Sequence, residues 1–353
     1  KATGGPGAAM VGTFLAGLVY GIVALIIKQA GYKWIMNILP PIVVGPVIIV
    51  IGLALAGTAV DMAMIDQVTK EYSLLLFSIA LVTLAATIVC SIYFKGMMSL
   101  IPILFGIIVG YVYALAVGVV DFTPVQEAKW LQMPDFLFPG VDYQVKITLD
   151  IVLLMVPVAI VTLSEHIGHQ LVLNKVVGRN YFKEPGLHRS ILGDGMATMI
   201  SGLIGGPPKT TYGENIGVLA ITRVYSVYVI FGAAVLATVF GFVGKITALI
   251  STIPTPVMGG VSILLFGIIA SSGLRMLVDS KIDFGDKRNL VISSVILVIG
   301  IGGAFIKVSD QFQIQGMALA AIIGILLNFI LPGREPVNED LFEEQSNNEN
   351  RVA

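Results

Sequence analysis

The chain contains few charged residues and a single cysteine. Of its 353 residues only 12% are charged, whereas soluble domains carry about 25%, so an ordinary soluble globular domain is excluded. Cys90 has no partner for an internal disulfide, and it gives no information on the redox compartment. The net charge of −1 excludes a generally basic surface of the kind that binds nucleic acid.

Motifs of common enzyme classes are also missing. The sequence has neither a Gly-rich phosphate-binding loop with Lys and Ser or Thr, nor the nucleophile turn of hydrolases. Its three histidines are His166, His169 and His188. The first two have a spacing that metal ligands use, but His188 follows a polar loop and does not complete a site with Glu165. We therefore expect no enzyme activity and no metal or other cofactor.

Long apolar segments dominate what is present. The chain is 56% hydrophobic, with a mean hydropathy of +0.92, and a membrane-spanning helix needs about 20 largely apolar residues. Residues 1–7 have no signal-peptide character, and we expect the N-terminus to be incomplete. The pattern predicts an all-α membrane protein with eleven spans, two of them short, at 8–27, 41–60, 74–94, 100–120, 147–163 (running on towards Val172), 190–204, 211–223, 227–250, 257–274, 290–305 and 317–331.

Charges in the loops predict the orientation of these spans. If the loop after Ile27 is cytoplasmic, the loops on that side hold thirteen Lys and Arg residues, against five on the other side. Cytoplasmic loops of membrane proteins carry such an excess. The acidic, Asn-rich tail 333–353 is then predicted to lie in the cytoplasm and to be disordered.

Two similar segments lie 214 residues apart. Residues 40–47 read PPIVVGPV and residues 254–261 read PTPVMGGV, and each opens a predicted span. By the loop charges, the first span enters from the cytoplasm and the second from outside. Repeats of opposite orientation predict the inverted-topology architecture of secondary transporters.

A helix break lies beside an acidic residue in the second half of the chain. The sequence Gly-Gly-Pro-Pro at 205–208 interrupts any helix, because proline removes backbone donors and glycine permits unusual dihedrals. Glu214 follows it. A carboxylate at bilayer depth costs a few kcal/mol and is retained where it lines a site or a pathway.

The backbone after this break is predicted to bind a ligand. A helix that restarts near Thr210 or Thr211, with these threonines as N-caps, leaves the N–H groups of the next residues free to donate to ligand carbonyls. Gly213 permits close approach of a ligand. Tyr212 either stacks on a flat ligand or packs against the protein.

Three polar residues near the break are expected to be structural. Asn215 is expected to orient Glu214 or to satisfy backbone groups, and Lys209 to reach towards water. Asp194 stands near the start of its predicted span, where it is expected to cap the helix.

A second acidic residue, Glu165, shares a helix face with His169, since the two are four residues apart. His166 points elsewhere. Such a pair can hold or release one proton near neutral pH, as proton coupling requires. Alternatively, Glu165 caps or salt-bridges the end of its span.

Three motifs together identify a resemblance. They are 164–169 (SEHIGH), 185–190 (PGLHRS) and 210–218 (TTYGENIGV). With these motifs the chain resembles the nucleobase–ascorbate transporter family, in particular its bacterial members that carry uracil, over about residues 12–331. The resemblance implies fourteen spans in two inverted repeats of seven, with the first three spans absent here and a short broken strand and helix at the site.

The resemblance also implies a domain organisation. A core domain would comprise 1–36 and 145–252, and a gate domain 37–144 and 253–332, followed by the tail 333–353. Members of the family suggest a homodimer formed through the gate domain. Location in the bacterial inner membrane, as a multi-pass protein with a cytoplasmic C-terminus, agrees with the loop charges.

The implied function is proton-coupled uracil symport by alternating access. Glu165 and Glu214 would accept hydrogen bonds from the ring N–H groups of uracil, and backbone N–H groups around Gly213 would serve a ring carbonyl. His169 would partner Glu165 in proton coupling, with Tyr212, Thr211 and Asn215 around the site. Relatives that carry purines or ascorbate usually have Gln at the position of Glu214, so Glu favours uracil.

Three alternatives stay open. A xanthine or other purine permease of the same family would share the architecture. An anion transporter of the same fold would need positive charge at the break, which Glu214 opposes and only Lys209 supplies. A chain lacking three spans would bind nothing if it failed to fold.

Overall fold

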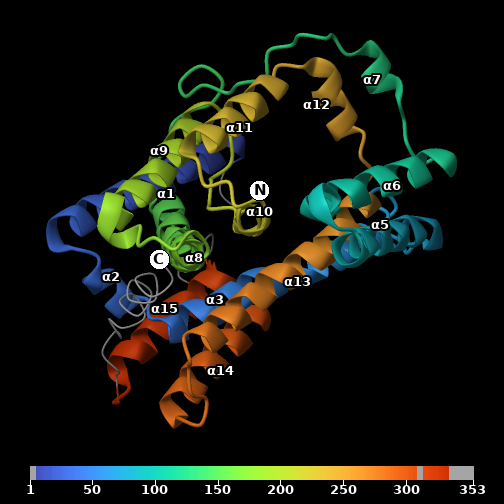
Figure 1. Cartoon of the computed structure of the whole chain (residues 1–353). Coiled ribbons are helices and arrows are strands. Elements are labelled where there is room, and N and C mark those ends of the chain that lie inside the picture. The colour runs from blue at the N-terminus through green and yellow to red at the C-terminus, as the bar shows by residue number, and fades with distance from the viewer. Residues whose placement is uncertain (1–4, 308–312, 334–353) are drawn as a thin grey trace. The chain divides into compact units, whose positions relative to one another are not determined.

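The computed structural model describes residues 5–307 and 313–333, and within them the chain is mostly helical (Figure 1). One antiparallel pair of short strands, β1 (Phe305–Lys307) and β2 (Gln313–Gln315), places Ile306 opposite Ile314. A 3-10 helix covers Gly96–Leu100 and a π-helical turn covers Phe182–Gly186. The α-helices are α1 (Pro6–Ala30), α2 (Lys33–Ile38), α3 (Pro41–Ala54), α4 (Ala56–Met64), α5 (Leu74–Tyr93), α6 (Pro102–Ala116), α7 (Thr123–Glu127), α8 (Leu149–Val177), α9 (Leu187–Leu203), α10 (Glu214–Thr222), α11 (Val227–Phe240), α12 (Gly244–Ser251), α13 (Thr255–Asp279), α14 (Lys287–Ile301) and α15 (Gly316–Ile330).

Several of these helices have the length and apolarity of membrane spans. Among the described residues, four are long and apolar enough to cross a bilayer: Pro6–Ala30, Pro41–Met64, Leu74–Tyr93 and Thr255–Asp279. Shorter apolar helices cover Pro102–Ala116, Val227–Phe240 and Gly316–Ile330. The predicted class, a helical multi-pass membrane protein, is confirmed at this level, while the inverted repeat and the absent spans stay predictions.

The span predicted at 41–60 is divided between α3 and α4, and the one predicted at 147–163 continues as α8 to Val177. Two further predicted spans are divided or shortened. The span predicted at 227–250 is divided into α11 and α12, since the chain turns at 241–243 and Gln132 N donates to Phe242 O at 3.0 Å. The span predicted at 290–305 ends early, because α14 stops at Ile301 and Phe305 already belongs to β1. Both differences arise from backbone hydrogen bonds to segments that are distant in sequence or follow a loop, which apolarity alone does not reveal.

The chain forms two compact units. The larger unit contains residues 5–54, 136–216, 269–307 and 313–333 of the described chain, and the smaller unit contains Leu55–Asp135 and Gly217–Ile268. The break and the helices that flank it up to Ile216 belong to the larger unit. The predicted division into core and gate domains is a separate, functional proposal.

In the larger unit α1 lies along α9 (Figure 1). Glycines permit this close packing, since a methyl group on Gly17 would approach Gly195 O to 2.6 Å, and one on Gly202 would approach Phe14 N to 2.8 Å. Small residues let membrane helices approach in this way. Large apolar side chains from α1, α8 and α9, among them Leu163, Ile167 and Ile191, form a buried cluster beside these contacts.

Both ends of α8 follow ordinary capping rules. The Thr148 hydroxyl accepts a hydrogen bond from Ile151 N at 3.4 Å at the start of α8. Gly178 ends that helix in a left-handed conformation, with its N–H donating to Asn174 O at 2.9 Å. These two caps define the ends of the helix that carries Glu165, His166 and His169.

Candidate functional site

The chain between α9 and α10, residues 204–213, is not helical, as the Gly-Gly-Pro-Pro sequence predicts. We call this whole segment the break. Gly205 has a φ of +90°, a conformation that glycine adopts readily. Gly206 N donates to Ser201 O at 2.7 Å, and the Ser201 hydroxyl donates to Pro207 O at the same distance. The break is therefore fastened to the last turn of α9 before it continues towards α10.

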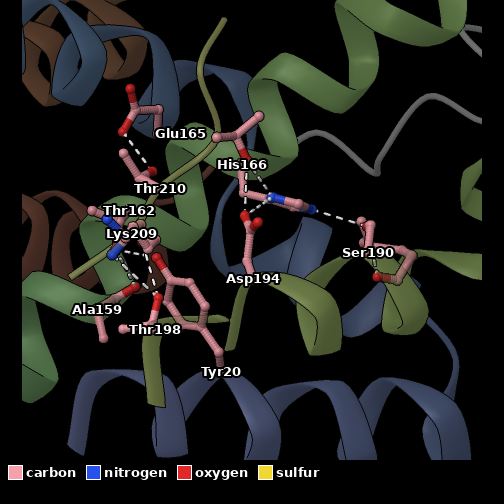
Figure 2. Close-up of polar contacts among 12 residues, drawn as sticks. Tyr20, Ala159, Thr162, Glu165, His166, Ser190, Asp194, Thr198, Lys209 and Thr210 are labelled. Carbon is pink, nitrogen blue, oxygen red and sulfur yellow. Dashed lines mark hydrogen bonds and ion pairs between the residues drawn. The ribbon is translucent and has the colours of Figure 1, made fainter. Parts of the chain in front are cut away.

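Two threonines tie the next residues to neighbouring helices. Lys209 N donates to the hydroxyl of Thr198, on α9, which in turn donates to Lys209 O, both at 3.2 Å. The Thr210 hydroxyl donates to Glu165 Oε2, on α8, at 3.2 Å (Figure 2). Consecutive residues of the break are thus bound to two different helices, and this fixes the backbone that precedes Gly213.

His166 is at the centre of a second group of contacts. Figure 2 shows its ring between Ser190 and Asp194. Nδ1 lies 2.8 Å from Asp194 Oδ2 and 2.6 Å from the Thr211 hydroxyl, and Nε2 lies 2.9 Å from Ser190 Oγ. The Thr211 hydroxyl donates to Asp194 Oδ2 at 2.9 Å. Side chains from α8, α9 and the break therefore meet at one imidazole.

Gly213 lies directly against His169. A methyl group built on Gly213 would overlap the imidazole of His169, so only glycine fits beside this ring. Within the described chain, Nδ1 of His169 is buried and has no hydrogen-bond partner. Two turns before His169 on α8, the Tyr20 hydroxyl of α1 donates to Thr162 Oγ1. Two turns of α8, from Thr162 to His169, thus contact both the break and α1.

The structure brings together much of the predicted site. Glu165 is buried, at 8% exposure, and Thr211, Gly213 and His169 lie close to it along α8 and the break. Tyr212 is 54% exposed, and Asn215 is also exposed while its N–H donates to Tyr212 O at 3.4 Å.

The side chain of Glu214 lies outside the described part of the structure, which gives only its backbone as the first residue of α10. Its role stays a prediction, and the backbone places it next to Gly213. No group of three or more His, Cys, Asp or Glu residues suited to a metal ion occurs among the described residues.

Two structural predictions are wrong. The threonines are not N-caps, because α10 begins at Glu214 and the hydroxyls of Thr210 and Thr211 bind carboxylates instead. Asp194 does not cap its helix, because α9 begins at Leu187 and Asp194 lies well inside it, bound to His166. In both cases contacts between helices determine the geometry, and local sequence preference does not.

The contacts of His166 are the part of the site that sequence reasoning missed. A signal was present, because Ser190 and Asp194 are four residues apart and therefore share one face of α9. Nothing in the sequence pairs that face with His166, which is 28 residues away from Asp194.

Comparison with known proteins agrees with this arrangement. The family model described as "Permease family" matches residues 1–309. The chain is 76% identical to the uracil permease of Bacillus caldolyticus over 98% of this chain and 79% of that protein. It is 65% identical to the uracil permease of Bacillus subtilis (strain 168) over 98% of this chain and 80% of that protein.

A more distant relative is the uracil permease of Escherichia coli (strain K12), which is 43% identical over 91% of this chain and 74% of that protein. The family model covers most of the chain, and each of these relatives exceeds the identity at which family membership is secure. The chain belongs to this permease family, the nucleobase–ascorbate transporters.

Proposed function

We propose that this protein is a proton-coupled uracil symporter that imports the base across the bacterial cytoplasmic membrane by alternating access. The observation that carries the proposal is the buried carboxylate of Glu165 beside a helix break whose backbone is fixed at Thr210 and Thr211. The similarity to proteins named uracil permeases supports the substrate.

The chemistry of the site suits a pyrimidine dione. Uracil is flat and neutral, and its ring N–H groups alternate with carbonyls. A carboxylate offers about four acceptor positions, so Glu165 can accept from a ring N–H while it holds Thr210. Glu214 would accept from the ring as well, and backbone N–H groups at Gly213 and Glu214 would donate to a carbonyl, with Tyr212 against the ring face.

Proton coupling is assigned to His169 with Glu165. Imidazole is the side chain that ordinarily exchanges a proton near neutral pH. Nδ1 of His169 has no partner among the described residues, so it can accept a proton, and the ring lies against Gly213 at the proposed binding position. Protonation of this ring would thereby be linked to the position of the bound base.

Several larger-scale features belong to the same proposal. A core domain of 1–36 and 145–252 would move against a gate domain of 37–144 and 253–332, and two copies would pair through the gate. The C-terminus would lie in the cytoplasm, as the thirteen-to-five distribution of Lys and Arg residues in the loops favours.

Uptake of radiolabelled uracil into proteoliposomes tests this function. With an inward-directed proton gradient we expect accumulation that collapses when the gradient is dissipated, and excess xanthine should not compete. In the same vesicles Glu214→Gln should weaken uracil binding by about tenfold or more, because an amide both donates and accepts where two acceptor oxygens are needed.

Other outcomes would favour the alternatives. Accumulation that xanthine blocks would assign a purine permease, and gradient-independent accumulation would remove the coupling proton. Flux of chloride or sulfate without uracil uptake would indicate an anion transporter. Unchanged uracil affinity in Glu214→Gln would remove Glu214 from the site.

A further inference from the structure

The proposed mechanism does not use the most fully hydrogen-bonded group near the site, His166. Its side chain is 3% exposed, and that of Asp194, its partner, is 28% exposed. Both lie within helices of an apolar membrane protein, where an unpaired charge is costly. A carboxylate and an imidazole 2.8 Å apart in such a position need an explanation.

The hydrogen atoms around the ring can be counted. The one hydrogen of the Ser190 hydroxyl has two acceptors within reach, Leu187 O at 3.0 Å and Nε2 at 2.9 Å. When it is donated to Leu187 O, the Ser190 oxygen accepts a hydrogen bond from Nε2. The Thr211 hydroxyl donates to Asp194 at 2.9 Å, so at Nδ1 its oxygen also accepts. With the Ser190 hydrogen on Leu187 O, both ring nitrogens face acceptors and both carry hydrogen, which is the imidazolium form.

The charge on this ring has a counter-charge. Asp194 Oδ2 receives one hydrogen bond from Thr211 and faces Nδ1, as an ionised carboxylate does. The pair is neutral overall, and both ring nitrogens and Asp194 Oδ2 are hydrogen-bonded, which favours a buried ion pair. Other ionisable groups with an electrostatic interaction with this pair are His169 of α8, which interacts with His166, and Tyr20 of α1, which interacts with Asp194.

The pair also holds the break. Thr211 is the point at which the segment between α9 and α10 contacts both charges, and it stands two residues before Gly213, which lies against His169. A shift of Thr211 would therefore move the backbone N–H groups assigned to the ligand. A displacement of about 1 Å at such a position is enough to weaken binding or transport substantially.

We propose that His166 and Asp194 form a resident imidazolium–carboxylate pair that positions Thr211, and through it the ligand-binding backbone, while the coupling proton is carried elsewhere. His166 and Asp194 are thus positioning residues and do not contact the substrate. The positioning role rests on the proposed function, whereas the charged pair itself does not.

Neutralising the charges separately and together tests the pair. Asp194→Asn would leave an unpaired imidazolium in a membrane helix, whereas His166→Gln with Asp194→Asn would leave two neutral groups that still hydrogen-bond. The melting temperature of the purified protein without substrate should fall in the single variant and largely recover in the double variant. Equal melting temperatures in the two variants, or no fall in the single one, would overturn the charged pair.

Variants of Thr211 test positioning. Thr211→Val keeps the shape but removes the hydroxyl, and we expect uracil affinity to fall by about tenfold with little change in melting temperature. Thr211→Ser restores the hydroxyl and should restore affinity. The matched control is Thr222→Val, whose hydroxyl donates to Val218 O within α10.

Affinity that is unchanged in Thr211→Val, or lost equally in Thr211→Ser, would overturn the positioning role. If the wild-type protein bound no uracil, the proposed function would fail, and the melting comparison of the charge variants would still decide whether the pair is ionised.

Discussion

Gly213 lies so close to His169 that any side chain larger than a hydrogen atom would clash with the imidazole ring. Because a methyl group there would overlap the imidazole, Gly213→Ala must displace either the ring or the backbone that is assigned to the ligand. We expect uracil affinity to fall by about tenfold or more, in a binding assay with radiolabelled uracil.

The control for this substitution is Gly217→Ala, which lies in α10, four residues after Gly213 in the sequence. A methyl group at Gly217 meets no atom within 4 Å, so the uracil affinity of the Gly217→Ala variant should match that of the wild type. Loss of uracil affinity in both variants would point to a general effect of alanine on this segment. Unchanged affinity in both would show that the His169 ring can move aside without weakening binding.

Individual residues of the site were predictable to different degrees. Glu165 and His169 follow from helical spacing, since residues four apart share a face. The partners of His166 do not, because Asp194 and Thr211 reach it only through packing of α8, α9 and the break. The prediction that Thr210 and Thr211 are N-caps was wrong for the same reason, because both hydroxyls donate to carboxylates on neighbouring helices.

At the scale of elements, α3 packs antiparallel against the part of α13 that belongs to the larger unit, from Ile269 onwards. Gly45 lies against Leu277, and Gly273 lies against Ile49, so residue numbers rise along one helix as they fall along the other. Glycines at the crossing allow this approach. The two helices begin at Pro41 and Thr255, inside the two motifs that the sequence related.

A second contact repeats the first with the roles exchanged. In the smaller unit Gly259 lies against Ala63. The offset of 214 residues relates Gly45 to Gly259 and Ala63 to Leu277. The predicted inverted repeat would produce a reciprocal pair of contacts of this kind, and that repeat stays a prediction.

These glycines give a prediction with internal controls. Gly259→Ala would place a methyl group against the backbone of Ala63, whereas Gly45→Ala meets mainly the side chain of Leu277. Because backbone yields less than a side chain, Gly259→Ala should destabilise the protein more, within about 1–3 kcal/mol. Melting of the purified protein measures both.

Gly57→Ala and Gly267→Ala serve as controls, since a methyl group at either meets no atom within 4 Å. They should melt like the wild type. A larger loss in the controls than at Gly259 would contradict the proposed crossing.

The predictability of the elements has a physical basis. Long apolar runs identify the helices that are solvated by lipid, and glycine with proline identifies the break. The division between α11 and α12 and the strands β1 and β2 depend on backbone hydrogen bonds to other segments, such as Gln132 with Phe242. Apolarity contains no information on those partners.

At the scale of the whole molecule, the direction in which α8 crosses the bilayer tests the predicted orientation of the protein. This helix has 29 residues, about 43 Å at 1.5 Å per residue, which exceeds the roughly 30 Å hydrocarbon core. It carries Glu165, His166 and His169, and the loop charges predict that Lys146 before it lies outside and Arg179 after it lies in the cytoplasm. The proposed site therefore requires α8 to cross the bilayer.

Cysteine labelling can test this crossing, because the chain has one cysteine, Cys90, which is buried. In a Cys90→Ala background, we expect a membrane-impermeant maleimide to label Lys146→Cys in intact cells. Arg179→Cys should react only after the membrane is permeabilised. Labelling of both from outside would mean that α8 does not cross, and the carboxylate of Glu165 would then lose its place at bilayer depth. The reverse pattern would keep the crossing and invert the predicted orientation, with the C-terminus outside.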